Sequence, residues 1–476
     1  MKERRKTMLT QKPKSSTIKV NKILLIQPPS VTIKGERKIC QVPLGLGYIS
    51  ANVNEEYDIK VIDAIVEGYD HEVPMGEEYI IFGLPFRKIR EEIVQYEPDM
   101  VAISIQSTAF YLNGLAIAKI TKHINKDIIV SVGGAYPSAD YKKVIDSEFI
   151  DYIMIGEGEE SFNELLEALN EKRKLNDVDG LIYKDSNKKV IMNPKRNYIT
   201  DLDSLRSPFT KLQNVDRYFK INSAHFETKS SRATHMITSR GCPNDCDFCT
   251  IHDVWGYKYR MRSTENVLEE VAMLKEKYDI TEIHFEDDNI AYNEERAIEI
   301  FKGLKKYNIK WGLPNGISLK TINKDLLKLM KESGCYTMAL PFESASQNTL
   351  QNIIHKYVDL EHGANMVKEA TKLGIETYGF FIVGFPGETM EDIRQTMEYS
   401  AGLGLTGIYI FYATPFPGTQ LLKQVVARGY MSDDKDLFQL TIERPSFGTK
   451  NFTVEDLWDY VEGYKNQMRK KGYNYL

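Results

Sequence analysis

The segment Arg240-Gly241-Cys242-Pro243-Asn244-Asp245-Cys246-Asp247-Phe248-Cys249 holds three of the five cysteines of the chain. The other two, Cys40 and Cys335, lie far from it in the sequence. Five cysteines in 476 residues are too few and too unevenly placed for a disulfide framework, and they are typical of a reducing compartment. The C-x3-C-x2-C spacing therefore predicts a metal-binding loop.

Two kinds of metal centre fit these thiolates. Together with His252, the three cysteines can complete a tetrahedral site for structural zinc. They can also hold a [4Fe–4S] cluster, in which one iron has no protein ligand and is open to a substrate or cofactor. A cluster that only carries electrons would take a fourth cysteine, and neither Cys40 nor Cys335 has a spacing that recommends it.

The C-x3-C-x2-C spacing, with Phe248 before the last cysteine, resembles the signature of the radical S-adenosylmethionine (SAM) superfamily. The resemblance implies that Cys242, Cys246 and Cys249 hold a [4Fe–4S] cluster and that SAM chelates the open iron. It also implies that a reductant such as flavodoxin or ferredoxin supplies the electron that cleaves SAM to a 5′-deoxyadenosyl radical. The protein then has to position the cofactors and exclude water.

From about residue 234 onward, short apolar runs alternate with amphipathic stretches of helical length. This pattern predicts repeated βα units and, with six strands, a partial (β/α)6 TIM-like barrel over 234–430. The expected strands are His235–Ser239, Glu282–Asp287, Ile309–Leu313, Thr337–Phe342, Thr377–Val383 and Gly407–Tyr412, with helices near 263–278, 293–306, 323–333, 359–373 and 388–402. Chemistry in such barrels lies at the carboxyl ends of the strands, and the cysteine loop follows the first strand.

Three later strand ends resemble SAM-contact motifs of the same superfamily. The residues concerned are Glu286, Asp287 and Asp288 after the second strand, Glu343 and Ser344 after the fourth, and Gly379, Gly384 and Glu388 along the fifth. The chemistry is suitable, because an ammonium group needs carboxylate partners and an adenine ring needs a strand without covering side chains. Taken singly, each motif is also an ordinary solvated turn or loop.

The N-terminal third shows another βα alternation, with five units. Strands are expected near 22–27, 59–63, 100–105, 128–132 and 152–155, and helices near 45–55, 86–96, 113–125, 139–147 and 159–170. Five such units predict an open, doubly wound parallel sheet of the flavodoxin or Rossmann-like type, which binds ligands beyond the carboxyl ends of its strands. No G-x-G-x-x-G follows the first strand, so a nicotinamide or flavin dinucleotide is not expected.

The strand ends of this domain are rich in glycine and hydroxyl residues. The phrases Pro43-Leu44-Gly45-Leu46-Gly47, Val132-Gly133-Gly134 and Gly156-Glu157-Gly158-Glu159 resemble the cobalamin-binding domain of B12-dependent radical SAM enzymes. The resemblance implies a cobalamin-binding domain over 20–172, with contacts from Ser104, Ser107, Thr108, Gly133, Gly134, Gly156 and Gly158. The D-x-H-x-x-G loop that ligates cobalt in other cobalamin proteins is absent from the sequence.

The remaining segments are expected to play supporting parts. Residues 1–19 are expected to be a disordered basic tail, 173–233 a linker or covering segment, and 431–476 a helical segment that can cover the substrate. The net charge of −5 argues against a nucleic-acid partner. No run of 18 apolar residues and no secretory signal is found, which predicts a cytoplasmic protein without a transmembrane segment.

The function that this resemblance implies is methyl transfer. A methyl group would move from methylcobalamin to an unactivated carbon of a small-molecule or lipid substrate, after the 5′-deoxyadenosyl radical has removed a hydrogen atom. A cobalamin-dependent cyclase or C–C bond-forming enzyme without methyl transfer is the alternative, and a zinc-stabilised binding protein is a remote one. A methylthiotransferase would need further N-terminal cysteines, whereas the first 200 residues contain only Cys40.

Overall fold

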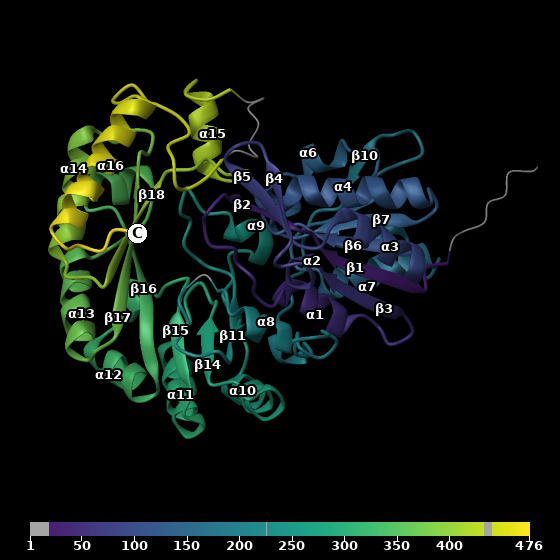
Figure 1. Cartoon of the computed structure of the whole chain (residues 1–476), viewed down its shortest axis with the longest axis horizontal. Coiled ribbons are helices and arrows are strands. Elements are labelled where there is room, and N and C mark those ends of the chain that lie inside the picture. Colours follow the sequence, from purple (N-terminus) through teal and green to yellow (C-terminus); the bar gives the residue numbers. More distant parts are fainter. Residues whose placement is uncertain (1–18, 225, 433–439) are drawn as a thin grey trace, which may run out of the picture.

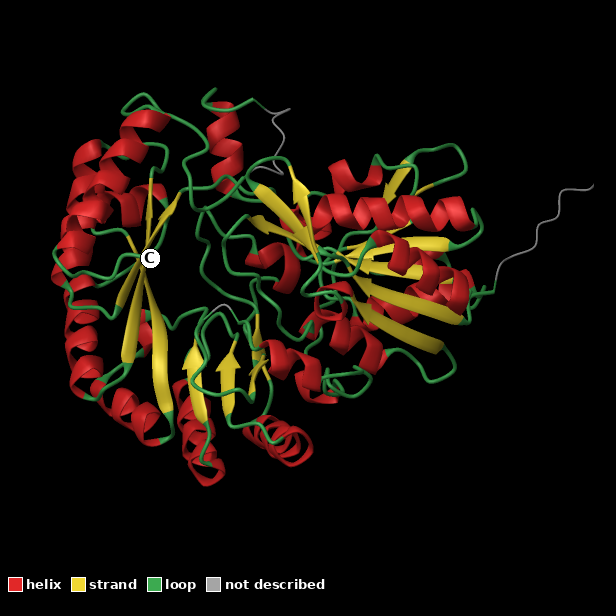
Figure 2. Ribbon diagram, in the orientation of Figure 1, coloured by secondary structure: helices red, strands yellow, loops and turns green. Residues whose placement is uncertain are grey.

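The computed structural model describes residues 19–224, 226–432 and 440–476, and the basic tail expected at 1–19 falls almost entirely outside these ranges. Two α/β domains lie side by side (Figures 1 and 2). The parallel core of the N-terminal sheet has the order β3-β1-β6-β7-β8. Its strands are β1 (Lys22–Gln27), β3 (Asp58–Asp63), β6 (Met100–Ser104), β7 (Ile129–Gly133) and β8 (Tyr152–Met154). In chain order this is 2-1-3-4-5, which confirms the predicted flavodoxin-type sheet.

Helices cover both faces of this sheet, and each face has a buried apolar cluster of its own. The helices are α1 (Leu44–Asn52), α2 (Ala64–Glu67), α3 (Phe86–Tyr96), α4 (Thr108–Ile124), α5 (Ala135–Ala139), α6 (Tyr141–Ile145) and α7 (Glu159–Leu169). All five residues of β6 are buried, as expected for a central parallel strand. The single helix predicted at 139–147 is instead two short helices, α5 and α6, and the second begins at the capping side chain of Asp140.

Two features of this half were not predicted. A three-stranded antiparallel sheet is formed by β2 (Ser30–Ile33), β5 (Tyr79–Phe82) and β4 (Glu72–Met75). In addition, β9 (Leu181–Lys184) pairs with β8, and β10 (Val190–Met192) pairs with β9. The main sheet therefore continues beyond residue 172, into the segment that was expected to be a linker. That segment also contains η1 (Leu175–Asp177), η2 (Leu202–Ser204) and α8 (Asp216–Ile221).

The C-terminal domain is the predicted half-open barrel. Its six parallel strands have the order β11-β14-β15-β16-β17-β18, which is the order of the sequence. They are β11 (Ala233–Met236), β14 (Glu282–Phe285), β15 (Lys310–Leu313), β16 (Cys335–Glu343), β17 (Glu376–Val383) and β18 (Gly407–Tyr412). The outer helices are α10 (Thr264–Tyr278), α11 (Glu294–Leu304), α12 (Lys324–Glu332), α13 (Leu360–Lys372), α14 (Met390–Gly402) and α15 (Gln420–Ala427). Short helical turns lie at η3 (Lys305–Tyr307), η4 (Leu319–Thr321) and η5 (Thr349–Ile353).

The first barrel strand is shorter than expected. It ends at Met236, because Thr238 and Ser239 turn aside to hydrogen-bond the carboxylate of Asp287. The chain then forms β12 (Ser239–Arg240), which pairs antiparallel with β13 (Arg260–Met261). These two short strands are the neck of the loop that carries the cysteines.

The C-terminal helix, α16 (Val454–Lys470), packs against α14 on the helix side of the barrel sheet (Figure 1). It therefore does not cover the barrel interior, where we expected the 431–476 segment to form a substrate cover. Within that segment, the Ile442 carbonyl accepts from Tyr412 N and Arg444 pairs with Glu78 of the N-terminal domain, at 3.5 Å. Through Arg444, this stretch therefore also contacts the N-terminal domain.

Within the described ranges, no helix is both long enough and apolar enough to cross a membrane.

Candidate functional site

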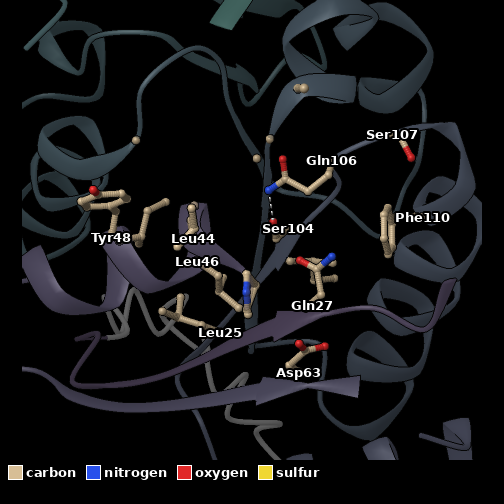
Figure 3. Close-up of a pocket in the computed structure, with 18 of the residues that line it drawn as sticks. Leu25, Gln27, Leu44, Leu46, Tyr48, Asp63, Ser104, Gln106, Ser107 and Phe110 are labelled. Atoms are coloured by element: carbon tan, nitrogen blue, oxygen red, sulfur yellow. Dashed lines mark hydrogen bonds between the residues drawn. The ribbon is translucent and has the colours of Figure 1, made fainter. Parts of the chain in front are cut away.

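A cavity of about 560 Å³ lies between the two domains. Its floor is formed by the carboxyl ends of the N-terminal strands and by α1, with apolar side chains such as Leu25, Leu44 and Leu46 (Figure 3). The barrel domain supplies the opposite wall, with His235, Ile237, Val254, Trp255 and Glu286. Because both domains contribute, a ligand in this cavity contacts the end of the sheet and the open side of the barrel together.

Most of the residues predicted to contact cobalamin line this cavity. They are Ser104, Ser107, Gly133, Gly134, Gly156 and Gly158. Thr108, the first residue of α4, does not line it, although its neighbours Ser107 and Ala109 do. Gly134 has a φ of +118°, and a Cβ there would lie 2.5 Å from the carbonyl oxygen of Ile105. The glycine thus lets the turn after β7 close tightly at the cavity edge.

Gln27 and Asp63 also line the cavity, and neither was predicted to be a site residue. Gln27 is 5% exposed, and its Oε1 has no hydrogen-bond partner. A buried amide oxygen without a partner is costly, and a ligand that donates a hydrogen bond would satisfy it. The large, mostly apolar cavity with an unsatisfied acceptor at the strand ends fits a corrin ring with its amide side chains. A strand end carrying glutamine is a weak signal in sequence, which is why this residue was missed.

On the barrel side, His235 of β11 points toward Glu286. The distance between His235 Nδ1 and Glu286 Oε1 is 3.4 Å, and His235 Nε2 lies 2.6 Å from the carbonyl oxygen of Val42. Both ring nitrogens are therefore engaged by the protein. Glu286, which was predicted to be a SAM contact, lies on the wall shared by the cavity and the barrel.

The cysteine loop leaves and re-enters the barrel through β12 and β13. Cys242, Cys246 and Cys249 are all free and only partly buried. Burial raises the pKa of Cys246 to about 12 and that of Cys249 to about 11, so these thiols are protonated in the metal-free chain. Metal binding would replace those protons.

The geometry of the loop bears on which metal it fits. In the described part of the chain, no three His, Cys, Asp or Glu side chains converge closely enough to hold a single metal ion. His252, the fourth ligand of the zinc alternative, lies with Nε2 2.9 Å from the Cys242 carbonyl oxygen and stacks on Tyr257. A mononuclear site needs its donors around one ion, whereas in a [4Fe–4S] cluster each cysteine binds a different iron. The three partly exposed cysteines therefore fit the cluster better than zinc.

Glu343 and Lys356 form an ion pair beside these cysteines. Glu343 Oε1 accepts from Lys356 Nζ at 2.6 Å, and Glu343 has a φ of +63° where β16 is bulged. The positive charge of Lys356 opposes the rise that burial causes in the pKa of Cys246. Lys356 was not predicted, since only the fold brings it from the segment after η5 to the cysteine loop.

The two adjacent aspartates after β14 have different surroundings. Asp287 is 1% exposed, and its Oδ1 accepts from the Thr238 hydroxyl at 2.7 Å. It therefore ties the end of β14 to the turn that leads into β12. Asp288 is exposed on the cysteine side, where the surrounding protein and the charge of Asp287 raise its pKa to about 7. Of the two, only Asp288 has a carboxylate free to meet a ligand.

The predicted SAM-contact residues along β17 and beside it also direct their side chains mainly into the protein. Glu388 is fully buried, and its Oε2 accepts from Gly384 N and Phe385 N, at 2.7 and 2.8 Å. Gly379 lies on the helix side of the strand, where a Cβ would be 2.5 Å from Leu405. The hydroxyl of Ser344 is buried and bonded to Thr396 of α14. These residues shape the loop after β17, and a ligand there would meet backbone atoms instead of their side chains.

Aromatic side chains line one wall of the barrel interior. Phe381 and Tyr412 face the helices, so the alternate residues of β17 and β18 face inward. Those inward residues are Tyr378, Phe380, Tyr409 and Phe411, and their rings contact one another and Phe226. All five are half-buried, and none belongs to the buried core of the domain. We call these five residues the aromatic wall.

Comparison with known proteins agrees with both halves of this description. The family model "B12 binding domain" matches residues 31–166, and the model "Radical SAM superfamily" matches residues 236–400. The cytidylyl-2-hydroxyethylphosphonate methyltransferase of Streptomyces wedmorensis is 30% identical over 94% of this chain and 89% of its own length. An uncharacterized methyltransferase of Pyrococcus horikoshii is 34% identical over 92% of this chain and 90% of its own length.

Among solved structures, the radical SAM methyltransferase TsrM from Kitasatospora setae, with cobalamin and a [4Fe–4S] cluster bound, superposes with a TM-score of 0.66. It shares 16% sequence identity, and the match covers 86% of this chain and 75% of that one. This likeness shows that the two chains share their overall fold.

The fold and the site thus define a radical SAM enzyme with a B12-binding domain in front of its barrel. The near full-length matches to methyltransferases show the family, and the chain belongs to the B12-binding radical SAM methyltransferases. This confirms the predicted fold class and the predicted cofactor set of that family, a [4Fe–4S] cluster, SAM and cobalamin. The alternative of a zinc-stabilised binding protein is wrong.

Proposed function

We propose that this enzyme transfers a methyl group from cobalamin to an unactivated carbon of its substrate. The observation that carries the proposal is the cavity whose walls come from both domains, with Trp255 of the segment after the cysteines on one side and the strand ends of the B12-binding domain on the other. Both reactive centres must reach a single substrate atom, and only a shared space between the domains allows this. When bound, the cofactors supply one-electron cleavage of SAM and a transferable methyl group.

The residues of the chain divide into binding and shaping groups. Cys242, Cys246 and Cys249 are proposed to hold the cluster, and Asp288 is proposed to offer its carboxylate to SAM. Glu286 instead lines the cavity between the domains, where its carboxylate meets His235 and Gln41. Gln27 and Ser104 offer hydrogen-bonding groups to cobalamin at the strand ends. Asp287 and Glu388 act through the loops that they hold, because their oxygens are occupied by the chain itself.

The substrate is proposed to bind between the cobalamin cavity and the aromatic wall. Half-buried rings with accessible faces favour a ligand that has a flat or apolar part. The Streptomyces wedmorensis relative is named for a cytidylyl phosphonate, which has a planar base. A small molecule or a lipid both satisfy this requirement, and an electron donor such as flavodoxin or ferredoxin is needed to reduce the cluster.

The test uses anaerobically purified enzyme loaded with iron, sulfide and cobalamin. We expect Cys246→Ala to bind hydroxocobalamin as the wild type does but to lose SAM cleavage to 5′-deoxyadenosine. The matched control is Cys335→Ala, because Cys335 is a buried thiol in β16 outside the loop. SAM cleavage retained in Cys246→Ala would contradict the cluster assignment. Product that lacks label from methyl-labelled SAM would favour ring or C–C bond formation over methyl transfer.

A further inference from the structure

The buried carboxylate of Glu157 lies between the cobalamin cavity and the neck of the cysteine loop. Glu157 follows β8 in the glycine-rich turn of the N-terminal domain, and Gly156, Gly158 and Glu159 beside it line the cavity. Its carboxylate, however, is directed at the barrel domain. It accepts from Arg240 at 3.0 Å and from Arg260 at 2.7 and 2.9 Å. Arg240 and Arg260 are paired residues of β12 and β13, the two strands that begin and end the loop.

Arg240 and Arg260 make further contacts around this carboxylate. Arg240 donates to Glu159 at 2.6 Å, and Arg260 donates to the carbonyls of Ile199 and Trp255, at 2.7 and 2.8 Å. The guanidinium of Arg240 also lies 4.6 Å from the ring of Trp255, which lines the cavity. One network of contacts thus joins the neck of the loop to the cavity wall. It also includes helix α9 (Ile251–Trp255), which follows Cys249.

Burial makes this network stiff. Glu157 is 2% exposed, and Arg240 and Arg260 are 3% and 4% exposed, so water cannot replace a lost partner. Removing one member of such a group leaves an uncompensated buried charge, which is strongly unfavourable. Two arginines and two glutamates balance in charge, and the pairing holds only if the loop neck stays on the N-terminal domain.

We propose that Glu157 is a positioning residue that fastens the cysteine loop to the cobalamin cavity, so that cobalamin binding and the ordering of the loop reinforce each other. This rests on the proposed function, since it takes cobalamin as the ligand of the cavity. A ligand that packs on Gly156, Gly158 and Trp255 favours the arrangement in which Glu157 holds both arginines. Coupling of this kind is reciprocal, so a formed cluster must also tighten cobalamin binding by the same factor.

The test measures the cysteine loop without enzyme turnover. Cluster-free protein is treated with iodoacetamide, with and without saturating hydroxocobalamin, and alkylation of Cys242, Cys246 and Cys249 is followed by mass spectrometry. In the wild type, we expect hydroxocobalamin to slow alkylation by at least about fivefold. In Glu157→Gln, we expect the slowing to fall below about twofold, while a spectroscopic titration still shows hydroxocobalamin binding.

A matched control is available in Glu270→Gln. Glu270 is equally buried, at 5% exposure, and pairs with Arg262 at 2.5 Å, but it does not line the cavity. We expect this variant to keep the wild-type slowing. If Glu157→Gln does not fold, the double variant Glu157→Gln/Arg260→Gln is used in its place. It removes one negative and one positive charge and leaves Arg240 paired with Glu159. In this variant, hydroxocobalamin must likewise slow alkylation by less than about twofold.

The outcomes separate the two proposals. Wild-type protein that binds no hydroxocobalamin would overturn the proposed function, whatever Glu157 does. Binding without any slowing of alkylation, equal slowing in Glu157→Gln, or equal loss in Glu270→Gln would each overturn the role of Glu157 alone. The reciprocal measurement is the hydroxocobalamin affinity with and without a reconstituted cluster. The affinity with the cluster, divided by the affinity without it, must exceed one in the wild type and approach one in Glu157→Gln.

Discussion

Asp63 places a carboxyl group in the cavity wall where little water reaches it. It is 6% exposed, its Oδ2 accepts from the Tyr218 hydroxyl at 2.6 Å, and its Oδ1 accepts from Ile65 N at 2.9 Å. Burial raises its pKa from 3.8 to about 6. Between these values the folded state keeps the proton while the unfolded state loses it, so the free energy of unfolding falls as the pH rises.

We therefore expect Asp63→Asn, which cannot ionise, to lack this part of the pH dependence. In urea unfolding of the cofactor-free protein, stability of Asp63→Asn relative to wild type should rise from pH 4 to pH 7 by on the order of 3 kcal/mol. The control is Asp58→Asn, which removes a carboxylate at the exposed start of the same strand and is measured over the same pH range. A parallel curve for Asp63→Asn would show that the buried carboxyl is already ionised at pH 4.

Single residues also show where reading the sequence stops being sufficient. The pair Asp287 and Asp288 was predicted from strand-end chemistry, but only the fold shows that the first is used by Thr238 and that the second is open. The cysteines could be found because their spacing is local. The role of Lys356 could not, because its partner Glu343 is 13 residues away and no local pattern marks it. Glu157 lies in a glycine-rich phrase that was noted, but its pairing with Arg240, 83 residues away, could not be inferred.

At the scale of elements, Gly379 on β17 is required by packing. A Cβ at this position would lie 2.5 Å from Leu405 and 2.8 Å from Phe381, both on the helix side. We expect Gly379→Ala to lower the free energy of unfolding by about 1–3 kcal/mol, because the core must shift to admit the methyl group. Chemical denaturation measures this, and SAM affinity at the far face of the strand should change little.

The control for β17 is Gly402→Ala at the end of α14. No atom lies within 4 Å of a Cβ built at Gly402, so the substitution should be neutral or stabilise the protein by up to about 1 kcal/mol. If Gly379→Ala proved as harmless as Gly402→Ala while SAM affinity fell, Gly379 would be a contact of SAM, as the family resemblance implied, and packing would not be its main role.

The elements that were predicted correctly are those with strong periodicity. β14 through β18 are short, largely buried strands separated by amphipathic helices, and this alternation is visible in the sequence. The β2-β5-β4 sheet was missed, since β2 and β5 are separated by α1, β3 and α2 and pair only in the folded chain. The pairing of β9 with β8 could not be inferred from periodicity either.

At the scale of the whole molecule, the parts that form the site meet at Gly418. This residue follows β18, and a Cβ there would contact the carboxylate of Asp253 in α9 and lie 3.2 Å from Ala139 in α5. The loop after the last barrel strand, the helix after the cysteines and the N-terminal domain therefore touch at one point. Since α9 also supplies Val254 and Trp255 to the cavity between the domains, a disturbance at Gly418 should reach that cavity.

We expect Gly418→Ala to weaken hydroxocobalamin binding by about fivefold, or about 1 kcal/mol, in a spectroscopic titration. Backbone strain also contributes to the effect of Gly418→Ala on stability, because Gly418 has a φ of +86°. Gly404→Ala separates the two causes, since Gly404 has a φ of +73° and no neighbouring atom within 4 Å of its Cβ. Both variants should lose about 1 kcal/mol of stability from strain, but only Gly418→Ala should lose affinity. Equal affinities would mean that α9 adjusts at Gly418 without moving the cavity wall that Val254 and Trp255 form.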